Sequence, residues 1–204
     1  AVLTARGLED AGLRLRIGSP VVGNDVDADG KPLVLVTGAN QGGKSTFLRS
    51  VGLAQLMMQA GLFVTAEAYR SAPAAGLFTH FKRGEDVELE RGKLDEELAR
   101  LSAIVEQLES GSMVLFNESF ASTNEHEGSR IGQDVVRALL EAQVRVVLVT
   151  HGYDLATAVA RRYGDVGLFL RAERQESGER TYRLHEGAPE PTSYGMDLYE
   201  EILG

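Results

Sequence analysis

The chain has 204 residues, of which 43% are hydrophobic and 25% charged, a composition typical of one globular domain. Thirty acidic residues against 21 basic ones give a formal net charge of −9, and a surface of that sign repels the phosphate backbone of nucleic acids. The lack of cysteine excludes disulfides and thiolate metal sites, and no apolar run approaches the roughly 18–20 residues that cross a bilayer.

We therefore expect one soluble domain over residues 1–204, without a membrane partner. The absence of cysteine is compatible with a reducing compartment, and we expect a cytoplasmic location. The chain begins Ala-Val-Leu, with neither an initiator Met nor a secretory pattern, which predicts a fragment of a longer protein.

The first 32 residues predict short strands separated by turns. Leu13, Leu15 and Ile17 alternate with arginine, a spacing typical of a strand, and a second short apolar pair follows at residues 21–22. Glycine, proline and aspartate punctuate this region and predict its turns.

The most informative stretch spans residues 38–46, between the apolar run 33–36 and a long apolar segment. Its spacing is G-x-x-x-x-G-K-[ST], in which glycines let backbone N–H groups approach phosphate oxygens closely. Lys44 would reach the β- and γ-phosphates, and Ser45 would offer its hydroxyl to Mg²⁺. The alternative is a glycine-rich turn without function, but a strand before it and a helix after it favour a nucleotide-binding loop. The predicted loop residues are Gly38, Ala39, Asn40, Gln41, Gly42, Gly43, Lys44, Ser45 and Thr46.

Apolar periodicity continues the pattern of alternating strands and helices. A helix is predicted over 44–60, a strand over 77–81, and a charged loop that covers the nucleotide over 82–92. A helix follows, with one apolar stripe whose members are Leu94, Leu98, Leu101, Val105 and Leu108.

The remaining elements complete an α/β pattern. Buried strands are predicted over 113–116 and 144–150, with helices around 131–140 and 153–160. An antiparallel hairpin is predicted from 166–170 and 181–184, followed by a terminal helix over 194–203. We expect a mainly parallel sheet flanked by helices, with an antiparallel edge.

Polar residues stand at the ends of the two later buried strands. Asn117 occupies the position where an acidic residue helps to hold Mg²⁺, and Glu118 would orient or deprotonate the attacking water. His151 follows the next strand, where it would sense the γ-phosphate. The alternative is that Asn117 and Glu118 cap a strand and that His151 is structural.

These segments together resemble the MutS-like mismatch-repair ATPases, whose ATPase domain is similar to that of ABC-type ATPases. The family's loop usually reads T-G-P-N-M-G-G-K-S-T, and residues 37–46 match it closely. Its D-E-x-x-x-G-T-[ST]-x-x-[DE]-G segment is matched in length by residues 117–128, and its Thr-His switch by residues 150–151. Residues 21–25 and 193–195 look like two further family segments, so the resemblance covers about residues 20–200.

The resemblance implies a P-loop NTPase of ABC-ATPase type that binds ATP and Mg²⁺ and hydrolyses ATP. It also implies a homodimer or paralogous heterodimer through the ATPase domain, with DNA held by domains absent from this chain. Each domain would complete its partner's site with the helix start around 92–98. The family commonly has Ser there, whereas this chain has Arg91, Gly92 and Lys93, and the alternative is a solvated face.

Two alternatives to this ATPase are a nucleotide-gated dimerisation module with little hydrolysis and an ABC-transporter nucleotide-binding subunit. Asn117 and the missing signature Ser motivate the first, and measured turnover separates it from an ATPase. The lack of an L-S-G-G-Q-like signature disfavours the second. Residues 22–25 are the candidate pocket for the nucleotide base. The expectation that the chain binds ATP in preference to GTP rests on the resemblance.

Overall fold

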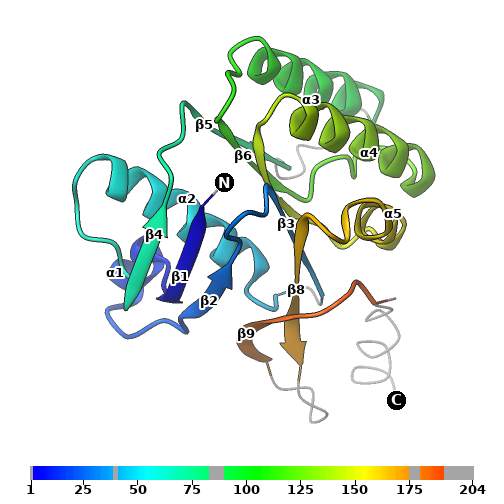
Figure 1. Ribbon diagram of the computed structural model, residues 1–204. Helices are drawn as coiled ribbons and strands as arrows, with labels where there is room; N and C mark the ends of the chain where they lie inside the picture. The colour runs from blue at the N-terminus through cyan, green and yellow to red at the C-terminus, as the bar shows by residue number, and fades with distance from the viewer. Residues whose placement is uncertain (1, 39–40, 83–89, 175–179, 191–204) are drawn as a thin grey trace, which may run out of the picture.

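The computed structural model describes residues 2–38, 41–82, 90–174 and 180–190 (Figure 1). The elements follow the chain in the order β1 (Leu3–Leu8), α1 (Ala11–Ile17), β2 (Asn24–Asp27), β3 (Leu33–Thr37), α2 (Lys44–Gln59), β4 (Ala68–Ser71), β5 (Leu77–Phe81), α3 (Glu90–Val105), β6 (Met113–Asn117), α4 (Glu125–Glu141), β7 (Arg145–Val149), α5 (Tyr153–Tyr163), β8 (Gly167–Arg174) and β9 (Arg180–Glu186).

A six-stranded sheet of order β5-β6-β7-β3-β8-β9 forms the centre of the fold. Neighbouring strands are parallel except β8 and β9, which form an antiparallel hairpin at one edge. The prediction of an α/β fold with a mainly parallel sheet, flanking helices and an antiparallel edge is confirmed.

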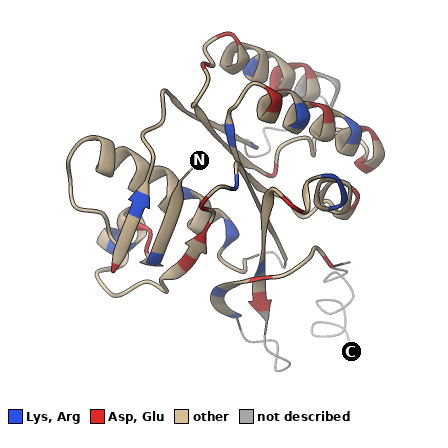
Figure 2. Ribbon diagram, in the orientation of Figure 1, with Lys and Arg blue, Asp and Glu red and all other residues tan. Residues whose placement is uncertain are grey.

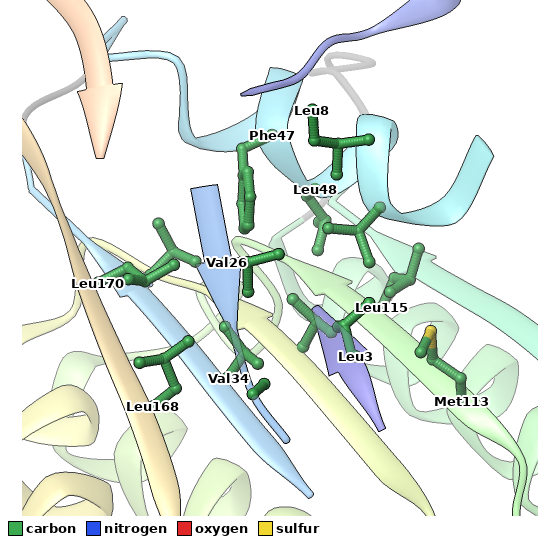
Figure 3. Close-up of a cluster of buried hydrophobic side chains, with 14 of the residues drawn as sticks. Leu3, Leu8, Val26, Val34, Phe47, Leu48, Met113, Leu115, Leu168 and Leu170 are labelled. Carbon is green, nitrogen blue, oxygen red and sulfur yellow. The ribbon is translucent and has the colours of Figure 1, made fainter. Parts of the chain in front are cut away.

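A second, three-stranded sheet of order β2-β1-β4 is antiparallel, with β1 in the middle. Its buried residues Leu3, Leu8 and Val26 share one core with α2 and the main sheet (Figure 3). This small sheet therefore covers part of α2, which explains why α2 carries apolar residues on more than one face.

The central strands are buried on both faces because helices cover both sides of the main sheet (Figure 1). Val34 and Val36 of β3 point into the core shared with α2, whereas Leu33 and Leu35 point into a second core lined by α3, α4 and α5. A strand covered on both sides reads as a continuous apolar run, and this is the pattern that β3, β6 and β7 have.

The prediction of a strand around Leu13 and Ile17 is wrong, because these residues lie in helix α1. The side chain of Asp10 accepts a hydrogen bond from the Leu13 N–H and caps the helix start, and Gly18 ends the helix in the left-handed conformation. The cap residues at both ends therefore favour a helix over the extended form that the alternation predicted.

Other differences concern short or edge elements. Strand β4 was not predicted, and α3 ends at Val105, before the expected Leu108. Only part of the predicted stripe on α3 is buried, since Leu101 lies in the core while Leu98 and Val105 are exposed. The loop predicted over 82–92 is wrong at its end, because α3 begins at Glu90, and its residues 83–89 lie outside the described residues, as does the predicted terminal helix.

Candidate nucleotide-binding site

Three polar segments meet at the carboxyl edge of three adjacent parallel strands. The loop at residues 38–46 follows β3, Asn117 and Glu118 follow β6, and His151 follows β7. The registers place Asn117 opposite Val149 and Val149 opposite Val36, so the three strands end at the same level. In open α/β sheets this edge is where ligands bind.

The loop begins with a glycine that cannot be replaced without strain. Gly38 has φ +110°, and an added Cβ would lie 2.9 Å from the backbone N of Ala172 on β8. The Lys44 amino group donates to the Gly38 carbonyl at 2.8 Å. Burial lowers the pKa of Lys44, and the nearby carboxylate of Glu118 partly offsets this effect.

The other loop residues surround the start of α2. Gly43 is the N-cap of the helix, and Gly42 is buried. Gln41 is exposed and accepts a hydrogen bond from Arg180. The Thr46 hydroxyl accepts a hydrogen bond from Arg49. Ala39 and Asn40 lie outside the described residues. The first turn of α2 thus opens toward the carboxyl edge of the sheet, and a helix start favours anions.

The structure brings the two predicted metal-binding residues together. The Ser45 hydroxyl donates to the Asn117 side-chain oxygen at 2.8 Å. Mg²⁺ prefers oxygen ligands and keeps several waters while binding substrate phosphates, so a hydroxyl and an amide oxygen at this distance fit it. Among the described residues, no group of three His, Cys, Asp or Glu side chains could hold a metal ion.

Glu118 and His151 form a close pair. One carboxylate oxygen of Glu118 lies 2.5 Å from His151 Nδ1 and accepts from the His151 backbone N–H at 3.0 Å. Burial raises the pKa of Glu118, but the hydrogen bonds and charge of His151, together with Lys44, outweigh it, so the pKa lies below its ordinary value. The same hydrogen bond raises the pKa of His151 against the opposing effect of burial.

A cavity of about 700 Å³ adjoins this edge. Gln41, Gly43, Lys44, Ser45, Thr46 and Glu118 line its polar side. Residues of α1, of the segment between α1 and β2, of the start of β2 and of β9 line its other side, and they are Leu13, Ile17, Pro20, Val21, Val22, Asn24 and Tyr182. The cavity therefore joins a polar end at the loop to a largely apolar end.

The sequence pointed to only part of this apolar end. Val22 and Asn24 of the expected 22–25 stretch line the cavity, whereas Asp25 accepts from the Gly7 N–H elsewhere. Tyr182 was not expected, because nothing in its local sequence distinguishes it. Its backbone is held by Asn24, whose side chain donates to the Tyr182 carbonyl at 3.1 Å and accepts from the Leu184 N–H at 2.7 Å.

Gly92 lies exposed in the first turn of α3, and the side chains of Arg91 and Lys93 lie outside the described residues. Their predicted role at a partner's site stays a prediction. In the part of the chain that the structure describes, no helix is both long and apolar enough to cross a membrane.

The family model and the similar proteins all match this chain to one family. The family model of MutS domain V matches residues 34–202. The DNA mismatch repair protein MutS of Caulobacter vibrioides is 33% identical over 191 residues, which cover 90% of this chain and 21% of that protein. DNA mismatch repair protein Msh6 of Gallus gallus is 32% identical over 209 residues (91% and 16%), and MutS protein homolog 4 of Mus musculus is 28% identical over 188 residues (89% and 20%). The chain spans about a fifth of the length of these relatives.

Proposed function

The chain belongs to the MutS family, and from this membership we propose that it is a P-loop domain of ABC-ATPase type that binds ATP with Mg²⁺ and hydrolyses it. One observation carries the proposal. The G-x-x-x-x-G-K-[ST] loop, the Asn117–Glu118 pair and His151 converge at one sheet edge beside a cavity of about 700 Å³. A nucleoside triphosphate needs these groups together in one place.

Each residue has a role that follows from its position. Lys44 would turn from the Gly38 carbonyl to the β- and γ-phosphates, and Ser45 and Asn117 would hold Mg²⁺. The bound metal supplies charge neutralisation on the phosphate oxygens. Glu118 would orient the attacking water and accept its proton, and His151 would hold Glu118 and contact the γ-phosphate.

The apolar end of the cavity would receive the base. Leu13 and Ile17 of α1 and Val22 offer apolar surface, and Tyr182 offers an aromatic ring on the β9 side. A planar base buries well between such groups, because aromatic contacts add to the burial of apolar area. We assign adenine to this pocket on family membership.

We infer the role of the whole protein from its relatives. Since several of them are named DNA mismatch repair proteins, we propose that this protein acts on DNA, with ATP-driven pairing of two such domains as the working step. The net charge of −9 supports a DNA contact in parts of the protein outside this chain. The partner would be a second copy or a paralogue, and family membership favours this role over a transporter subunit.

Steady-state ATP hydrolysis tests the proposal, measured across a Mg²⁺ titration and at several protein concentrations. We expect Mg²⁺-dependent turnover per chain that rises with concentration, because two domains form each complete site. Lys44→Ala should abolish it, and Glu118→Gln should still bind ATP but retain it uncleaved. Circular dichroism of both variants controls for folding.

A second candidate is the nucleotide-gated dimerisation module. It is favoured by Asn117, which offers Mg²⁺ an amide where a carboxylate binds more strongly. In this case ATP would bind and promote pairing at every concentration without turnover. Absence of ATP binding by the folded chain would contradict both candidates.

A further inference from the structure

The turn that carries Glu118 has an unusual backbone. Glu118 has φ +54° and Phe120 has φ +68°, and neither is glycine. Such left-handed residues are strained and persist only where the surroundings fix them. Something must therefore hold residues 118–120 in this conformation.

Two buried side chains hold this turn from outside the strand. The Ser119 hydroxyl donates to the His80 carbonyl at 2.8 Å and lies 2.7 Å from His80 Nδ1. The Phe120 N–H donates at 2.7 Å to Oε1 of Glu97, which is a residue of helix α3. His80 Nε2 in turn lies 3.1 Å from the Glu97 carbonyl oxygen, so the hydrogen bonds at Ser119 and at Phe120 belong to one network.

The buried position of the Glu97 carboxylate destabilises the folded state. Its side chain belongs to a residue only 3% exposed, and its second oxygen, Oε2, is buried without a hydrogen-bond partner among the described residues. A buried carboxylate with an unpartnered oxygen costs several kcal/mol, and an apolar side chain of similar volume would avoid this. Packing alone therefore does not explain a glutamate at this position.

We propose that Glu97 is a positioning residue for Glu118. By accepting the Phe120 N–H it fixes the left-handed turn, and the turn aims the Glu118 carboxylate at His151 and the phosphate end of the cavity. The role rests on the proposed ATPase function and deepens it, since it links the orientation of the residue that acts on water to helix α3.

The test compares three substitutions in the whole chain. Glu97→Leu removes the acceptor with a side chain of similar size, Glu97→Gln keeps an acceptor oxygen, and Leu101→Ala loosens the same helix from the core that it shares with Phe120 while Glu97 stays in place. The readouts are kcat and the dissociation constant for ATP, thermal midpoint, and the ¹⁵N shift of His151 Nδ1 in the nucleotide-free chain. Glu97→Met replaces Glu97→Leu if the latter does not fold.

We expect Glu97→Leu to lower kcat by about tenfold to a hundredfold, because misplacement of a reacting group by about 1 Å has effects of this size. ATP affinity should stay within about twofold, and the His151 Nδ1 shift should move toward that of Glu118→Gln. Glu97→Gln should restore kcat and the shift.

Equal loss of kcat in Leu101→Ala at the same thermal midpoint would overturn the proposal, since helix packing would then account for the effect. An unchanged His151 shift in Glu97→Leu would also overturn it. If the wild-type chain binds ATP but does not hydrolyse it, the ATPase function fails, while the His151 shift still decides the role of Glu97.

Discussion

The contact between Glu118 and His151 favours the charged form of both side chains. The pKa of Glu118 lies below its ordinary value of 4.5 and that of His151 lies above its ordinary value of 6.5. For Glu118 the stabilisation is present above pH 4.5 and lost as pH falls through its folded pKa. For His151 it is present below pH 6.5 and lost as pH rises through its folded pKa. The pair is therefore fully stabilising between about pH 4.5 and 6.5 and weakens on either side.

We predict that NMR titration of the nucleotide-free chain gives His151 a pKa above 6.5, and that Glu118→Gln lowers it, because the carboxylate that favours the imidazolium is gone. Glu127→Gln is the matched control, since this acid at the start of α4 bonds to Thr123 instead. An identical His151 titration in wild type and Glu118→Gln would contradict the pairing.

Asn117 is the one position in the site where an amide replaces the expected carboxylate. We predict that Asn117→Asp lowers the Mg²⁺ concentration needed for half-maximal hydrolysis or raises kcat, because Mg²⁺ favours carboxylate oxygen. ATP affinity should stay within a few-fold, since Asp keeps the acceptor for Ser45. Superimposable Mg²⁺ titrations of the two proteins would show that the carboxylate is not needed.

Among the elements, α4 is packed closely against the turn that carries Glu118. A Cβ added at Gly128, in the first turns of α4, would lie 2.1 Å from the Phe120 carbonyl oxygen. This contact requires the absence of a side chain, and it explains why a glycine stands eleven residues after Asn117.

We predict that Gly128→Ala destabilises the fold by about 1–3 kcal/mol, as overpacking does, and lowers turnover by displacing the turn. Chemical denaturation measures the free energy of unfolding. Gly92→Ala is the control for this measurement, because an added Cβ there meets no atom within 4 Å and alanine favours a helix. Equal stability of Gly128→Ala and wild type would show that α4 can shift freely.

The elements that sequence predicted well are those with a strong local signature. Strands β3, β6 and β7 are buried on both faces and read as unbroken apolar runs, so the residues that follow them could be named as site candidates. The prediction for helix α1 is wrong because Leu13 and Ile17 line the cavity and Leu15 is exposed, so its apolar residues mark no core-facing helix face. Strand β4 alternates between half-buried and exposed positions, which leaves no clear pattern. Tyr182 and Glu97 act through contacts with residues far away in the chain, and no local pattern reveals such contacts.

At the scale of the whole molecule, net charge affects which partners the chain can bind. Acidic and basic residues are interspersed along α3 and α4 (Figure 2), and the sum is −9. Nucleic-acid affinity depends mainly on basic side chains that neutralise phosphates, and a surface of this kind supplies little of it.

We predict that this chain alone binds duplex DNA more weakly than about 10⁻⁵ M at physiological salt, which is in the range of non-specific binding. Fluorescence anisotropy with a labelled duplex, with and without ATP, measures this. Submicromolar binding that falls steeply with added salt would place a DNA site within this chain.

The central position of β3 also governs the order in which the site can form during synthesis. Strand β3 pairs with β7 and β8, so that Leu33 lies opposite Val146 and Gly167. A ribosome makes β3 before both of the strands that flank it, which begin at Arg145 and Gly167, more than a hundred residues later in the chain. Pairings between distant segments form slowly. A nascent chain would therefore carry its phosphate-binding loop exposed and unformed until most of the domain had been translated.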